Sequence, residues 1–191
     1  TLNFTVGDIS RVPVPENLVN KVSQQLIDIY KGDWAKIEVA HEYQGNSLVT
    51  NKQKLLKLSF VIYAEKRDAI IAISNNLEKE NNSFFIEAYG LQDELTMEVP
   101  EGQITLLRAT PEEEIKQLIS YTIGCMMGRY SLDEAGLIYA QSNNDGFDVS
   151  RYKVFPADAD GIVPIMDISW FDDDATDRFI EFIKVVWPSE H

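Results

Sequence analysis

Few residues of this sequence belong to the types that perform chemistry in enzymes. Its two histidines, His41 and His191, are too few for a typical multi-histidine metal site. The single cysteine, Cys125, lies beside an apolar helical stripe with only Arg129 nearby to favour a thiolate. We therefore expect a buried structural thiol and not a nucleophile. One cysteine also excludes an intrachain disulfide, which argues against the disulfide-stapled secreted class.

Two acidic clusters resemble metal sites only weakly. In the motif Asp158-Ala-Asp-Gly161, a calcium loop with Gly161 as its glycine would place Pro156 at the first ligand and Asp167 at the twelfth. Neither residue suits those positions, so an Asx-type turn is expected. The acids at 172–174 could bind magnesium with a phosphate. They are more simply explained as residues that cap a helix beginning there and interact with the positive end of its dipole.

One stretch of the chain is locally basic, in the range 52–67, where Glu65 is the only acid. Such a patch could contact a nucleic-acid backbone, or it could be the solvated face of a helix. The candidate DNA-backbone residues are Lys52, Lys54, Lys57, Lys66 and Arg67.

The segment Gly124-Cys-Met-Met-Gly128 has glycines at small-x-x-x-small spacing. This spacing allows a neighbouring backbone to approach closely, and we expect tight helix packing with Gly128 also ending the helix. A phosphate loop is excluded because the segment ends a helix, and no Lys-Ser/Thr pair follows it.

The surrounding elements are predicted to be mainly helical. The clearest helix is 111–127, with Thr110 as N-cap, Glu113 completing a capping box, and a stripe from Ile115 to Met127 facing the core. Further helices are expected at 14–32, ending at Gly32, and at 51–64, 65–89 and 172–186, with a buried strand as the alternative for 58–63. Short strands are expected at 103–108, 137–140 and 162–165. The expected fold class is therefore α+β, mainly helical with a few short β-strands. We expect one helical connector-type domain over 1–191, with a possible sub-boundary near 102–110.

The charge disfavours a stand-alone nucleic-acid binder. The chain has 17 basic and 31 acidic residues, hence a net charge of −14. Residues 1–110 hold 11 basic and 15 acidic groups, net −4, and residues 111–191 hold 6 and 16, net −10. No apolar run has the length of a membrane span, and no signal peptide is recognisable, so we expect a cytoplasmic protein without membrane contact.

Several strings of the sequence resemble one family. They are 85–96, 158–165, 170–173 and above all 119–140, which contains Gly128-Arg129-Tyr130-Ser131-Leu132-Asp133; Gly32-Asp-Trp34 fits more loosely. The sequence is similar there to the large single-chain adenine-specific DNA methyltransferases of bacterial phage defence (BREX, PglX-type) and related type II restriction–modification systems.

This resemblance implies a parent enzyme that uses S-adenosylmethionine and acts on DNA. The family's Asn-Pro-Pro-Tyr-type motif and glycine-rich cofactor loop are both missing, since no two prolines are adjacent and no Gly-x-Gly occurs. The chain is therefore expected to be an excised, non-catalytic helical segment without cofactor, which begins at Thr1 and whose partners are the other domains of the parent and, through them, DNA. The signature residues are taken as structural: Gly124, Gly128, Arg129, Tyr130 and Asp133. Arg129 and Asp133 could form an ion pair that fixes the turn, or could contact the methyltransferase core.

Two other functions remain open from the sequence. The acidity of residues 111–191 suggests an interaction module, in the extreme a DNA mimic that occupies a partner's DNA channel. The aspartate clusters suggest a metal-dependent enzyme.

Overall fold

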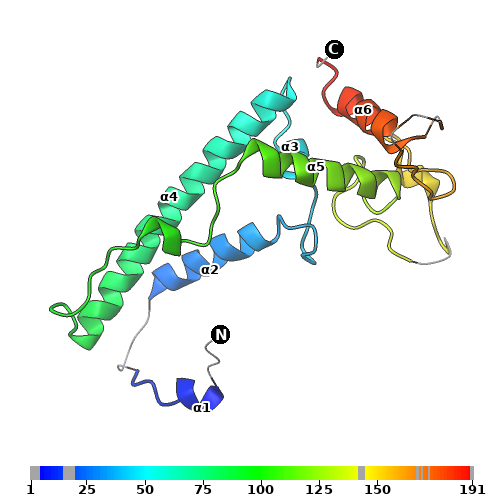
Figure 1. Cartoon of the computed structure of the whole chain (residues 1–191). Helices are drawn as coiled ribbons and strands as arrows, with labels where there is room; N and C mark the ends of the chain where they lie inside the picture. Colours follow the sequence, from blue (N-terminus) through cyan, green and yellow to red (C-terminus); the bar gives the residue numbers. More distant parts are fainter. Residues whose placement is uncertain are drawn as a thin grey trace. The chain divides into compact units, whose positions relative to one another are not determined.

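The computed structural model describes residues 5–14, 20–141, 145–166, 168, 170, 171 and 173–189. All regular elements in these ranges are helical, and Figure 1 shows them in chain order. The α-helices are α1 (Val6–Ile9), α2 (Lys21–Trp34), α3 (Ser47–Thr50), α4 (Leu56–Tyr89), α5 (Pro111–Met126) and α6 (Ala175–Val186); the short 3₁₀ turns are η1 (Glu101–Gln103) and η3 (Val149–Arg151).

The three expected strands are wrong for the described residues. In 103–108, Ile104 and Leu106 are buried as an alternating pattern requires, but the segment runs as irregular chain without a paired neighbour. In 137–140 the segment does not pair as a strand, and Ile138 N donates a single backbone hydrogen bond to the Arg129 carbonyl at 2.9 Å. In 162–165 Val163 packs against the core while Ile162 and Ile165 are exposed, but the segment runs as irregular chain. Mainly helical is therefore correct, and the α+β description is not.

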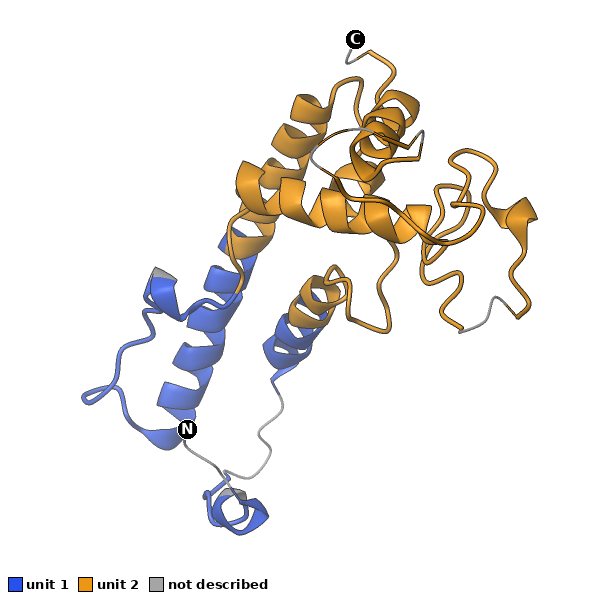
Figure 2. Cartoon of the chain, turned by 45° about the vertical axis from the view of Figure 1, so that its right-hand side comes forward, with its two compact units in different colours: residues 1–29, 72–105 blue, residues 30–71, 106–191 orange. Residues whose placement is uncertain are grey.

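The chain forms two compact units, which Figure 2 distinguishes by colour. Unit 1 consists of Thr1–Ile29 and Ala72–Thr105, and unit 2 of Tyr30–Ile71 and Leu106–His191. Helices α2 and α4 each contribute residues to both units.

Unit 1 is held by polar side chains as well as by a small apolar core. Asn81 Oδ1 on α4 accepts from Asn20 Nδ2 at 2.9 Å and from Ser23 Oγ at 3.0 Å. The Tyr89 hydroxyl donates to the Pro13 carbonyl at 2.6 Å. These bonds join the two stretches of chain that make up this unit.

Helix α4 is one continuous helix where the sequence predicted two. Its buried positions in unit 2 follow a helical period: Ser59, Tyr63, Arg67 and Ile71 lie four residues apart. Since half of these residues are polar, the apolar stripe was weak, and the strand alternative for 58–63 is wrong. The helix begins at Leu56, five residues later than expected.

Helix α2 differs from its prediction at both ends. It begins at Lys21, after Asn20, whose side chain accepts from Val22 N at 2.9 Å. It also continues through Gly32 to Trp34, so Gly32 does not end it. Pro15, the expected first-turn residue, lies outside the described residues.

Helix α5 confirms the expected cap but buries a rotated face. Thr110 Oγ1 accepts from Glu113 N at 3.4 Å, whereas the Glu113 carboxylate lies 2.9 Å from Lys116 Nζ instead of completing the capping box. Ile119 and Met127, expected in the buried stripe, are exposed. The buried face runs instead through Glu114, Leu118, Tyr121, Thr122, Gly124, Cys125 and Met126.

The core of unit 2 lies around α5, which packs against α3 and α6. It comprises Tyr43, Leu48, Tyr63, Leu118, Tyr121, Cys125, Met126, Tyr130, Phe155, Phe182, Val186 and Trp187. Asp174 caps α6 by accepting from Thr176 N at 2.8 Å. Trp187, which follows α6, is fully buried and donates from Nε1 to Ser59 Oγ of α4 at 2.9 Å. This bond fixes the end of the described chain to the start of α4.

Within the ranges that the model describes, every helix is too short or too polar to cross a membrane.

Candidate functional site

The string 128–133 begins where α5 ends. Gly128 has φ of +72°, and its N–H donates to the Cys125 carbonyl at 3.0 Å, while Arg129 N donates to the Gly124 carbonyl at 2.7 Å. These two bonds form a Schellman motif, which requires a left-handed residue and so favours glycine. The prediction that Gly128 ends the helix is confirmed.

Tyr130 folds back onto α5 after this turn. Its ring stacks on Tyr121 with centroids 5.2 Å apart and meets Tyr43 edge-on at 5.4 Å. A Cβ on Gly124 would lie 2.5 Å from Tyr130 Cδ2, so Gly124 is small because a tyrosine ring covers it. The close neighbour is therefore a side chain from the following loop, and not the neighbouring helix backbone that the glycine spacing suggested.

The Tyr130 hydroxyl belongs to a polar cluster around Glu38. It donates to Glu38 Oε1 at 3.1 Å, and Ser120 Oγ donates to Glu38 Oε2 at 2.6 Å. Burial, and then the charge of Glu38, raise the pKa of Tyr130 to about 12. The phenol therefore stays protonated and serves as a hydrogen-bond donor at neutral pH.

Ser131 and Asp133 bind the chain's own backbone. Ser131 Oγ donates to the Arg151 carbonyl at 2.7 Å. Asp133 Oδ2 accepts from Lys153 N at 2.8 Å and Val154 N at 2.9 Å. Asp133 thus fixes the turn after α5 without Arg129, because no ion pair between the two is present in the described structure. The ion-pair interpretation is wrong, although the structural role of Asp133 is clear.

Arg129 lines a hollow of about 910 Å³ with both polar and apolar residues around it. Its side chain is exposed and has no ion-pair partner among the described residues. The polar residues around the hollow are Glu38, His41, Gln44, Ser120, Arg129 and Tyr130. A guanidinium offers five donors suited to a carboxylate or phosphate, so this hollow can receive an anionic group.

Cys125 is a structural thiol, as expected. It is buried in the core beside Tyr121, and burial raises the pKa of its thiol to about 12. A thiol with that pKa carries almost no thiolate at neutral pH and is a poor nucleophile.

The five candidate DNA-backbone residues are not equivalent in the structure. Lys52, Lys54 and Lys57 are exposed, whereas Lys66 Nζ donates to Asn51 Oδ1 at 2.7 Å. Arg67 is buried, is paired with Asp33, and donates from Nε to the Leu107 carbonyl at 2.7 Å. Arg67 is therefore a structural residue whose guanidinium does not face solvent.

Sequence reasoning missed the buried ionic cluster to which Arg67 belongs. Glu114 of α5 is only 5% exposed, and its Oε2 has no hydrogen-bond partner among the described residues. Burial raises the pKa of Glu114, while the charges of Arg67 and Lys36 oppose that rise. Lys36 Nζ also lies 5.8 Å from the Tyr63 ring centroid. The only signal in the sequence is an acid, Glu114, in the first turn of α5, where an acid is equally explained as a partner of the helix dipole.

The acidic motifs act as turn and cap residues. Asp158 Oδ2 accepts from Asp160 N at 3.0 Å and Gly161 N at 2.8 Å, which is the expected Asx-type geometry. Asp167, Asp172 and His191 lie outside the described residues. Over the part of the chain that the model covers, no group of three or more His, Cys, Asp or Glu residues is placed to hold a metal ion.

The chain is similar over its whole length to two curated methyltransferases. It is 37% identical to the adenine-specific methyltransferase BrxX of Escherichia coli O9:H4 (strain HS), with 100% of this chain and 17% of that protein covered. It is 32% identical to the adenine-specific methyltransferase PglX of Lacticaseibacillus casei (strain Zhang), with 100% and 16% covered. No family model matches the sequence. The chain is thus homologous to a segment spanning about one sixth of these relatives, and the resemblance drawn from its sequence is confirmed.

Proposed function

We propose that this chain, as a homologue of part of the BrxX and PglX adenine-specific methyltransferases, is a non-catalytic helical connector. Its parent would be a site-specific DNA adenine-N6 methyltransferase of a phage-defence or restriction–modification system that uses S-adenosylmethionine. The connector would position the catalytic core and the target-recognition region on DNA. The observation that carries this proposal is homology along the full chain to a slice of such enzymes, in a sequence without adjacent prolines or Gly-x-Gly.

The geometry of the signature string supports a positioning role. Gly128, Tyr130, Ser131 and Asp133 are all engaged by their own chain in ending α5 and fixing the turn that follows. The side chain of Arg129 is exposed and lines a hollow. In this proposal Arg129 binds a carboxylate of another domain of the parent, because a bidentate Arg–carboxylate pair gives a fixed orientation.

DNA would be contacted mainly through other regions of the parent. Lys66 and Arg67 are already engaged within the chain. Lys52 and Lys54 remain available for phosphate, and Lys57 lies beside an apolar groove treated below. We therefore expect the isolated chain to bind DNA weakly and with strong salt dependence.

The acidic residues do not favour the DNA-mimic alternative. Asp133, Asp148, Asp158 and Asp174 each accept hydrogen bonds from the chain's own backbone. A mimic would need its carboxylates in outward rows at phosphate-like spacing. These four are instead used to hold turns and a helix start.

Two measurements test the connector proposal. Titration calorimetry of the isolated chain with S-adenosylmethionine should give no binding heat. In the full-length enzyme, Arg129→Gln should lower DNA adenine methylation several-fold while leaving S-adenosylmethionine affinity unchanged. Lys116→Gln on α5 is the control, since it removes only exposed ion pairs. Tight cofactor binding by the isolated chain, or full activity of Arg129→Gln, would contradict the proposal.

A further inference from the structure

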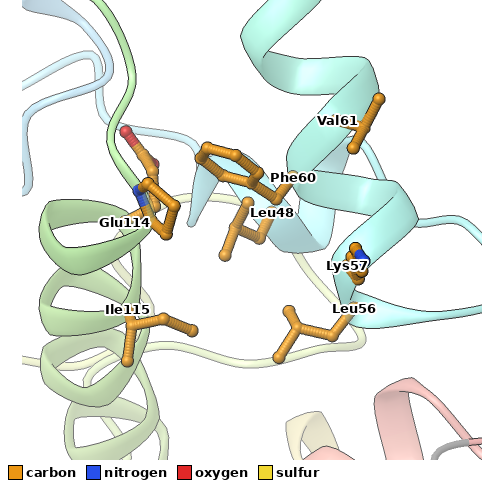
Figure 3. A pocket seen from close by; sticks show the side chains of 8 residues that line it. Leu48, Leu56, Lys57, Phe60, Val61, Glu114 and Ile115 are labelled. Atoms are coloured by element: carbon orange, nitrogen blue, oxygen red, sulfur yellow. The ribbon is translucent and has the colours of Figure 1, made fainter.

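An apolar groove lies between α4 and α5 in unit 2. Figure 3 shows Leu56 and Ile115 facing one another across it, with Leu48 of α3 between the two helices. Its volume is about 510 Å³, within the range of pockets that hold ligands or anchor side chains. The apolar lining residues are Leu48, Leu56, Phe60, Val61, Pro111 and Ile115.

The charged residues of the groove have opposite signs and very different exposure. Glu114 lines it but is buried and interacts with Arg67 and Lys36, so it contributes little charge to the opening. Lys57 is exposed at the groove, with Lys52 and Lys54 nearby in sequence. The first turn of α4 holds no acid, so the positive end of the helix dipole adds to the charge of Lys57. The opening is therefore apolar with a positive rim.

We propose that this groove receives an amphipathic segment from another region of the same methyltransferase. Apolar side chains of that segment would fill the groove, and an Asp or Glu beside them would pair with Lys57. This inference rests on the proposed connector function.

Two observations support this occupant. The relatives are about six times as long as the aligned chain, so most of a parent of this kind lies outside it. An acidic segment fits the rim of the groove, because Lys57 lines it, is exposed, and has no ion-pair partner among the described residues. A nucleic-acid backbone fits less well, since the apolar walls offer no donors to phosphates and the chain carries a net charge of −14.

The test is zero-length carbodiimide cross-linking of the full-length methyltransferase, followed by mass spectrometry. Lys57 should be joined to an Asp or Glu outside these 191 residues. Val61→Lys, which places a charge in the groove, should lower the yield of this cross-link by about tenfold, since burying an unpaired charge costs more than 1.4 kcal/mol. Leu58→Lys is the matched control: Leu58 is an exposed apolar residue of α4 that does not line the groove, and its replacement should leave the yield unchanged.

Several outcomes would overturn the assignment. They are the absence of a Lys57 cross-link, a Lys57 cross-link within these residues or between two copies, and equal yields for the two lysine variants. Loss of the Lys57 cross-link when DNA is added would also overturn it, because DNA would then occupy the groove in place of protein. Methylation assays on the same preparations separate the two proposals. A preparation that binds no S-adenosylmethionine and methylates no DNA removes the connector function, whatever the cross-link shows.

Discussion

The packing of Tyr130 on Gly124 yields a sharp prediction about one methyl group. Replacing Gly124 by alanine adds a Cβ that would lie 2.5 Å from Tyr130 Cδ2 and 2.7 Å from Cε2. The ring has little room to withdraw, because it stacks on Tyr121 and its hydroxyl is bonded to Glu38. In α2, by contrast, a Cβ on Gly32 meets no atom within 4 Å. The same substitution should therefore have opposite effects at the two helical positions.

The expected magnitudes follow from opposing terms. Gly→Ala in a helix interior stabilises by roughly 0.5–1 kcal/mol. Overpacking a core costs about 1–3 kcal/mol, and displacing the Tyr130 hydroxyl from a carboxylate costs about 1.5–3 kcal/mol more. Gly124→Ala should thus lower the free energy of unfolding by about 1.5–5.5 kcal/mol, whereas Gly32→Ala should raise it by about 0.5–1 kcal/mol.

Urea unfolding followed by tryptophan fluorescence measures both effects in the same unit. All three tryptophans, Trp34, Trp170 and Trp187, belong to unit 2, as do both glycines. In a Tyr130→Ala background the ring is gone, and Gly124→Ala should become stabilising by about 0.5–1 kcal/mol, like Gly32→Ala. If Gly124→Ala proves neutral or stabilising with Tyr130 intact, the proposed reason for this glycine is refuted.

Three further predictions concern unit 2. Trp187→Phe should lower the free energy of unfolding by about 1–2 kcal/mol, because Ser59 loses its buried donor. Trp170→Phe, at an exposed site, should change it by no more than about 0.5 kcal/mol. Urea unfolding followed by circular dichroism measures both, and equal effects would contradict the hydrogen bond. Arg67→Met should cost about 3–5 kcal/mol, since it removes the buried cation from Asp33 and Glu114 and leaves them only Lys36, against about 0–1 kcal/mol for Arg108→Gln in the exposed pair with Asp68; similar losses would argue against a buried cluster. Burial raises the pKa of Glu114 in the folded state above its unfolded value, so the stability that this group contributes is present below the unfolded pKa and is lost as pH rises through the folded pKa. The stability of Glu114→Gln relative to the wild type should accordingly rise as the pH increases above the unfolded pKa of a glutamate, and a difference that stays flat or falls would contradict the shift.

Local signals in the sequence were sufficient to predict the helices whose ends carry clear capping residues. Thr110 and Pro111 mark the start of α5, and Gly128 marks its end, because caps and left-handed turns depend on residues close together in the chain. The predicted end of α6 at 186 is also correct, and Phe182 and Val186 are buried, but the helix begins at Ala175, after its cap Asp174, and not at 172. Local rules failed at Gly32, because α2 continues to Trp34 with Asp33 paired to Arg67, and in 103–108, where alternation reflects burial against a core without a paired strand.

The candidate site depended on contacts that no local pattern contains. Glu38 meets Tyr130 across 92 positions of sequence, and Arg67 meets Leu107 across 40. Arg67 looked like a member of a basic patch because it follows Lys66 in the locally basic stretch 52–67. A helix turns by about 100° per residue, however, so adjacent residues face different surroundings. The buried partner of a charge can be identified only once the helices are packed.

The acidity of the chain makes the unpaired state of Arg129 in the described structure informative. In a chain with 31 acidic residues, a basic side chain finds an internal partner easily, and Arg67, Arg108, Arg151 and Arg178 all do so within the described structure. Arg129 has Glu38 in the same hollow, yet that carboxylate is already bonded to Ser120 and Tyr130. No ion pair joins Glu38 to Arg129 among the described residues, although both line the same hollow. An exposed arginine without an internal ion-pair partner in the described structure can bind an anion from outside the chain, which is the arrangement that a connector between domains needs.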